Sequence, residues 1–146
     1  MSSKLDLIHG ILLVSVTIAL LPGCGDSRGL VPVKGKITFD GAQPPKAGRL
    51  NFGPATAAEG YPRRPGQASF DSEGKFEVTS YQPGDGLTPG TYRVNVICVE
   101  HDPAPVPGGF EAVTYVAPGY QGQEVVVSAG SKPIELNFDV PLKKRK

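Results

Sequence analysis

Two cysteines and one Glu-His-Asp triplet hold most of the reactive side chains in this 146-residue chain. Cys24 stands at the end of an apolar run, whereas Cys98 lies in TYRVNVICVE, a stretch in which alternate residues are apolar. A reactive thiol needs exposure and a cationic neighbour. The alternation around Cys98 indicates neither, so we predict that Cys98 is a small buried core residue.

The triplet Glu100-His101-Asp102 combines residue types that ligate metals. Neighbouring residues of an extended chain point to opposite sides, so these three side chains would converge only at a special turn. We therefore expect a solvated loop edge, with no metal site and no cofactor. The sequence also contains no phosphate-binding loop of the G-x-x-x-x-G-K-[ST] type. These observations predict that the protein is not an enzyme.

The apolar run before Cys24 has the length of a secretory signal. Lys4 supplies a positive charge near the N-terminus, and residues 11–21 are almost continuously apolar. This run is shorter than the about 20 residues that a membrane-spanning helix needs. The sequence Leu21-Pro22-Gly23-Cys24 resembles the bacterial lipobox, in which an aliphatic residue at −3 and a small residue at −1 precede the lipidated cysteine. The resemblance implies that residues 1–23 are removed and that Cys24 carries lipid.

Lipidation of Cys24 would fix the location and the cysteine chemistry of the mature protein. It implies a membrane-anchored lipoprotein of the bacterial cell envelope, on the periplasmic side or at the cell surface. Cys98 would then have no intramolecular disulfide partner, so the core must hold the domain together. A plain secretory signal or an uncleaved anchor helix is the alternative. The formal net charge of +1, together with export, argues against a nucleic-acid partner.

Short alternating stretches follow the polar tether of residues 24–30. The chain has 19 glycines and 15 prolines, which is typical of many turns between short strands. No long segment shows helical periodicity. We therefore predict that residues 31–140 form a single antiparallel β-sandwich of about seven strands, followed by the basic tail 141–146.

Several turns and faces of this domain can be predicted in detail. Residues 71–74 suit a hairpin turn, and residues 129–130 suit the junction of a last pair of strands. The segments 55–66 and 101–109 are expected to be exposed loops. Tyr92 begins an alternating core face that ends at Cys98, and its hydroxyl is placed to bond a loop carbonyl.

Three segments together carry a resemblance to a known family. VKGKITFDGAQPPKAGRLNFGP, FDSEGKFEV and LTPGTYRVNV resemble, in order and spacing, the carboxypeptidase regulatory-like domain of small bacterial lipoproteins. The likeness extends from Val31 to Val140 and implies a transthyretin-like (prealbumin-like) β-sandwich. The catalytic domain that such modules accompany binds zinc through paired histidines and a glutamate. His101 is the only histidine after Cys24, so that zinc site is not expected here.

The exposed loop before residue 66 offers the best candidate for ligand binding. Tyr61, Arg63 and Arg64 combine an aromatic face with two guanidinium groups, a composition that suits acidic sugars or carboxylates. The tail Lys143–Lys146 could contact anionic lipid headgroups.

These features predict a non-catalytic, lipid-anchored envelope protein that serves as a structural or binding module. Its expected partners are the membrane, through the N-terminal lipid, and an envelope protein or glycan. The alternative is a small hydrolase-like or accessory enzyme with a site near Glu100-His101-Asp102.

Overall fold

The computed structural model describes residues 28–144, and of Phe110 the backbone alone. This part of the chain is all-β, as predicted, and contains no helix. It accordingly holds no helix long and apolar enough to cross a membrane. The predicted signal segment 1–23, Cys24 and the last two residues of the basic tail lie outside the described residues.

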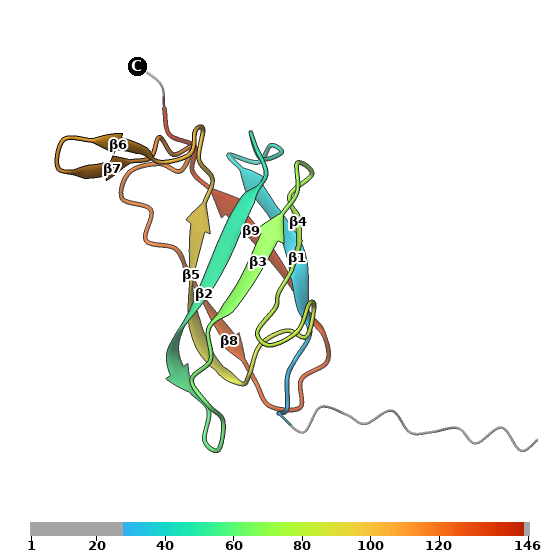
Figure 1. Ribbon diagram of the computed structural model, residues 1–146. Helices are drawn as coiled ribbons and strands as arrows, with labels where there is room; N and C mark the ends of the chain where they lie inside the picture. The colour runs from blue at the N-terminus through green and yellow to red at the C-terminus, as the bar shows by residue number, and fades with distance from the viewer. Residues whose placement is uncertain (1–27, 145–146) are drawn as a thin grey trace, which may run out of the picture.

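Seven of the strands form one continuous sheet in the order β8-β5-β2-β3-β4-β1-β9, and two form a separate hairpin. The strands of the large sheet are β1 (Val33–Phe39), β2 (Gly48–Ala57), β3 (Gly66–Phe70), β4 (Lys75–Glu77), β5 (Gly90–Ile97), β8 (Gln123–Val127) and β9 (Ile134–Val140). The hairpin consists of β6 (Ala104–Val106) and β7 (Gly109–Glu111) and projects away from the large sheet (Figure 1).

The large sheet curls into a half-barrel around the core (Figure 1). Phe52 of β2 and Phe138 of β9 lie with ring centroids 6.5 Å apart, although β3, β4 and β1 separate their strands in the sheet. Phe76 of β4 stacks on the same Phe138 ring at 5.7 Å. Apolar side chains from both halves of the curled sheet therefore fill one common core.

The sheet is mixed, whereas the sequence suggested purely antiparallel pairing. β1 pairs in parallel with β9 along its whole length, from Val33 opposite Ile134 to Phe39 opposite Val140. The predicted pairing of the last two strands is also wrong, because β8 pairs with β5 and β9 pairs with β1. Alternation identifies a strand and its buried face, but a strand's partner depends on which sheet edge is open to it.

The predicted core faces are confirmed. Val33, Ile37 and Phe39 of β1 are buried, and Tyr92 and Val94 of β5 are each 1% exposed. Val96 is only partly buried but packs against the same core. The buried pattern therefore follows the sequence alternation closely.

Cys98 is a buried free cysteine, as predicted. Burial raises the pKa of its thiol, and the nearby Lys46 carbonyl and side chain offset only part of that effect. A buried thiol with a raised pKa has little thiolate and is a poor nucleophile at neutral pH.

The Tyr92 hydroxyl forms the predicted bond to a loop carbonyl. It donates to the Thr88 carbonyl at 2.8 Å, and the Thr88 hydroxyl lies 2.8 Å from it. The side chains of Tyr92 and Thr88 are both buried, so these hydrogen bonds replace the bonds to water that their hydroxyl groups lose. This contact holds the β4–β5 loop against the start of β5.

The predicted hairpin at residues 71–74 is confirmed. The Asp71 carboxylate accepts hydrogen bonds from the backbone amides of Glu73 and Lys75, each at 2.9 Å. Gly74 has φ 83°, and a Cβ there would lie 2.0 Å from the Ile37 carbonyl oxygen. Only glycine fits both the backbone conformation and the close approach. In the segment 101–109, by contrast, the structure has strand β6 and the turn into β7 where we expected only a loop. The predicted loop 55–66 is also shorter than expected, because β2 continues to Ala57 and β3 begins at Gly66.

Candidate binding surfaces

The loop predicted to bind a ligand is partly occupied by contacts within the protein. The Arg63 guanidinium folds back on β2 and donates from Nη2 to the carbonyls of Pro54 and Ala55 at 2.8 and 2.9 Å. Tyr61 is half-buried and lies against Gly29, where an added Cβ would be 2.6 Å from the Tyr61 ring. Arg63 and Tyr61 therefore help to fix the loop in place.

Arg64 crosses to the loop that joins β4 to β5. Its Nε and Nη2 donate to the Ser80 carbonyl at 3.2 and 2.8 Å, and its Cζ lies 4.3 Å from the centroid of the Tyr81 ring. Arg28 also lies over this ring, with Cζ 4.6 Å from the centroid. The aromatic partner of Arg64 is therefore Tyr81, not Tyr61 as the sequence suggested. We refer to Arg28, Arg64 and Tyr81 as the arginine–tyrosine cluster.

Asp85 shapes the loop that presents Tyr81. Its carboxylate accepts hydrogen bonds from the backbone amides of Ser80, Tyr81 and Gln82 at 2.7, 2.9 and 2.8 Å. Partial burial acts to raise the pKa of Asp85, but the hydrogen bonds from these three amides outweigh it and hold the pKa below its ordinary value. The ionised carboxylate is thus the form that fits the loop.

We expect Asp85→Asn to destabilise residues 24–146 by about 1 kcal/mol at pH 7, because an amide cannot replace a carboxylate that accepts three amide hydrogens. A group with a lowered pKa in the folded state adds stability above its unfolded pKa of about 3.9 and loses that contribution as the pH falls. Urea denaturation at pH 7 and pH 3 should therefore show a smaller gap between the two proteins at pH 3. Asp102→Asn, on an exposed side chain, serves as the control, and an equal gap at both pH values would contradict this role for Asp85.

The Glu100-His101-Asp102 triplet lies in the connection between β5 and β6. Glu100 is half-buried, and its backbone amide donates to the Val113 carbonyl at 2.7 Å, whereas His101 and Asp102 are exposed. Arg93 lies further back in the same strand, β5, and does not join the triplet. Its Nη2 lies 3.7 Å from Glu124 Oε2 on the neighbouring strand β8. In residues 28–144 no group of three or more His, Cys, Asp or Glu side chains is placed to hold a metal ion.

The segment Gly25-Asp26-Ser27-Arg28-Gly29 spells the G-x-S-x-G pattern of a hydrolase nucleophile elbow. Such an elbow acts at a sharp turn between a strand and a helix. Here the chain that follows leads into strand β1, and residues 25–27 lie outside the described residues. The pattern alone therefore does not indicate a hydrolase site.

A second candidate surface lies on the convex face of the sheet, where register aligns three amide side chains. Asn95 of β5 lies opposite Asn51 of β2, and Asn51 lies opposite Gln67 of β3. We call Asn51, Gln67 and Asn95 the amide row. Within residues 28–144 none of these three side chains forms a hydrogen bond, so their donors and acceptors face outward without a partner from the described chain.

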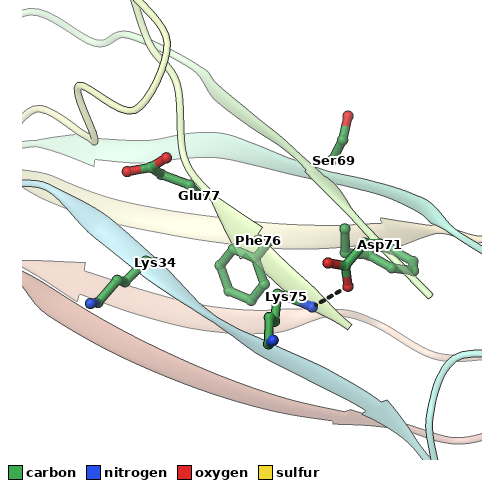
Figure 2. A pocket seen from close by; sticks show the side chains of 7 residues that line it. Lys34, Ser69, Asp71, Lys75, Phe76 and Glu77 are labelled. Atoms are coloured by element: carbon green, nitrogen blue, oxygen red, sulfur yellow. Dashed lines mark hydrogen bonds between the residues drawn. The ribbon is translucent and has the colours of Figure 1, made fainter. Parts of the chain in front are cut away.

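Two shallow depressions of about 540 and 400 Å³ share Ser69 and Glu77, and Gln67 of the amide row lines the smaller one. Figure 2 shows Lys34 and Glu77 on one side of the larger depression and Asp71 and Ser69 on the other, with Phe76 between them. We call the two depressions the outer-face groove. Its polar lining residues are Lys34, Arg49, Gln67, Ser69, Asp71, Lys75, Glu77 and Thr79.

No family model and no curated protein matches this chain. The interpretation of both surfaces therefore depends on their own geometry and chemistry.

The outer-face groove offers hydrogen bonding with little net charge. Three basic side chains line it, Lys34, Arg49 and Lys75, against two carboxylates, Asp71 and Glu77. Lys34 lies directly opposite Glu77 in the β1–β4 pairing, so a basic and an acidic residue face each other at this point of the groove. Amides, hydroxyls and balanced charges favour an uncharged, hydroxyl-rich ligand over a strongly anionic one. The sequence alone did not reveal this surface, because it depends on the register between β5, β2 and β3.

Proposed function

We propose that this chain is a lipid-anchored protein of the bacterial cell envelope whose β-domain binds a ligand and catalyses no reaction. The lipobox-like sequence that ends at Cys24 supports the anchor and the envelope location. The unpartnered amide row beside the outer-face groove supports the binding role. The predicted Tyr61-Arg63-Arg64 site is less suited to this role, because Arg63 and Arg64 already bond to backbone carbonyls.

The proposed fold assignment is a transthyretin-like sandwich of the carboxypeptidase regulatory-like type. Two features support it beyond the sequence motifs. The Tyr92 hydroxyl bonds back to the Thr88 carbonyl four residues upstream, an arrangement typical of sandwich folds. The curled sheet also brings the rings of Phe52 and Phe138 within 6.5 Å of each other across one core, as the two layers of a sandwich would.

The ligand class that best suits the outer-face groove is a neutral envelope glycan. Sugar hydroxyl and acetamido groups can both donate and accept hydrogen bonds, and the amide side chains of Asn51, Gln67 and Asn95 can complement both roles. A stable protein partner would call for large apolar or aromatic anchors at the centre of the surface. The apolar residues that line the groove, Ala68, Phe70 and Phe76, are all buried in the core, so they offer no exposed anchor of this kind.

We expect Asn51→Ala combined with Gln67→Ala to weaken binding to insoluble cell-wall glycan by about 10- to 30-fold. Each lost hydrogen bond contributes about 1 kcal/mol, and 1.4 kcal/mol is a factor of ten. Co-sedimentation of the protein with purified cell-wall glycan measures the dissociation constant.

The matched control is Gln82→Ala combined with Asn137→Ala, which removes the same two amide types outside the groove. Both control positions are exposed, so their replacement should leave glycan binding unchanged. No sedimentation of the unaltered protein, or equal losses in both double variants, would refute the glycan-binding role.

A further inference from the structure

The outer-face groove continues into a third depression, which has a volume of about 540 Å³. This depression shares Arg49 and Ser69 with the smaller part of the groove, and Ser69 and Phe70 with the larger part. Its other walls come from the end of β5 and from the connection between β5 and β6, near the β6–β7 hairpin (Figure 1). We call it the end depression. Beyond the shared residues, its lining includes Ile97, Val99, Asp102 and Pro103.

Strand register places the end depression beside the amide row. Arg49 of β2 lies opposite Ile97 of β5 and opposite Ser69 of β3. Each of these three residues stands two positions along its strand from a member of the amide row, so both rows share the convex face of the sheet. Two residues of a strand span about 7 Å. A sugar that binds at the amide row can therefore place a substituent in the end depression.

The end depression offers an apolar surface that the rest of the groove lacks. Ile97 is 42% exposed, Val99 is half-buried and Pro103 is exposed. The apolar residues that line the other two depressions are, by contrast, buried in the core. A small apolar group of a ligand that contacts Ile97 and Val99 leaves water, which favours its binding.

The charged residues at the end depression supply one group of donors and one acceptor. Arg49 and Asp102 are the only charged residues of the described chain that line it, so their charges balance. Within residues 28–144 neither side chain forms a hydrogen bond or an ion pair. Lys46, which lies next to the depression in sequence, donates from Nζ to the Glu100 carbonyl at 3.3 Å. The Arg49 guanidinium and the Asp102 carboxylate are therefore available to a ligand.

An acetamido group matches this combination of surfaces. Its carbonyl oxygen accepts a hydrogen bond, its N–H donates one, and its methyl group is apolar. Arg49 can donate to the carbonyl oxygen and Asp102 can accept from the N–H, while the methyl group contacts Ile97. A ligand carboxylate would be repelled by Asp102 and a ligand ammonium by Arg49, and a simple hydroxyl group leaves the apolar surface uncovered.

We propose that the end depression selects N-acetylated sugars, with the acetamido methyl group against Ile97. This inference rests on the glycan-binding part of the proposed function and names the class of sugar. The amide row binds hydroxyl groups that all neutral sugars carry. The end depression then distinguishes an N-acetylated sugar from one that has a hydroxyl group at the same carbon.

The test compares two uncharged trisaccharides, tri-N-acetylchitotriose and cellotriose. They have the same linkage and differ only in carrying an acetamido or a hydroxyl group at one carbon of each sugar. Calorimetric titration of the full chain, kept in a detergent without a sugar headgroup, measures both dissociation constants. We expect the N-acetylated trisaccharide to bind about 20-fold more tightly, since one methyl group that leaves water contributes about fourfold and one further hydrogen bond about fivefold.

Substitutions in the end depression should reduce this preference without weakening the binding of cellotriose. Ile97→Ser should lower the preference about fourfold and Asp102→Ala about fivefold. Asp102→Asn keeps an acceptor oxygen and should retain most of the preference. Val126→Ser is the matched control for Ile97→Ser, because Val126 is 65% exposed on β8 and lies outside all three depressions. Neither trisaccharide is charged, so the change of charge at Asp102 does not itself alter the ratio.

Three results would overturn the inference. The first is equal affinity of the unaltered protein for the two trisaccharides, the second is a full preference in both Ile97→Ser and Asp102→Ala, and the third is an equal loss in Val126→Ser. Co-sedimentation with cell-wall glycan reports the proposed function separately. Protein that sediments with this glycan but shows no preference contradicts the end-depression inference alone. Protein that binds neither the glycan nor the trisaccharides contradicts the glycan-binding function and the inference together.

Discussion

Val94→Asp is expected to prevent the β-domain from folding. Val94 is 1% exposed on β5, a strand that pairs on both sides and faces the common core. An aspartate there would place a carboxylate among apolar side chains with no partner for its charge. Such a group costs several kcal/mol, a large part of the about 5–15 kcal/mol that stabilises a domain of this size. Circular dichroism of residues 24–146 should show no cooperative thermal transition.

Asn95→Asp is the matched control for this prediction. The neighbouring residue on the same strand points to the convex face and is exposed. The same aspartate there stays in water, so we expect a melting curve close to that of the unaltered domain. Similar melting curves for the two variants would mean that the faces of β5 are assigned incorrectly.

The sequence predicted the strands and their buried faces well, because both follow from local alternation. The alternating burial along residues 31–39 and 92–98 matched the prediction except at Val96, which is only partly buried, and the 71–74 turn matched as well. The pairing of strands could not be predicted in the same way. β9 joins β1 in parallel across about 100 residues of sequence, and nothing in the alternation of either strand distinguishes that partner from β8.

The candidate surfaces were harder to predict than the fold. The sequence drew attention to Tyr61 because it is two residues from Arg63, but the loop turns so that Arg64 meets Tyr81, seventeen positions further on. The amide row joins residues from β5, β2 and β3, which only the register aligns. Surfaces built from distant segments leave no local pattern, whereas a core strand does.

Cys24→Ser is expected to abolish lipidation and to leave the unprocessed precursor. Diacylglyceryl transfer uses a thiol as the acceptor, and a serine hydroxyl at the same position does not replace it. The expected change is all or none, because the lipid is attached at one residue. Stable anchoring should be lost with it, since more than one acyl chain, at about 0.8 kcal/mol per buried methylene, is what holds such a protein on a membrane.

Labelling of cells with radioactive palmitate tests the central claim, a lipid-anchored envelope protein, most directly. Cys98→Ser is the control, because Cys98 is buried in the core and takes no part in the proposed modification. The account predicts label in the unaltered protein and in Cys98→Ser, and none in Cys24→Ser. Equal label in Cys24→Ser and the unaltered protein, or no label in either, would contradict it.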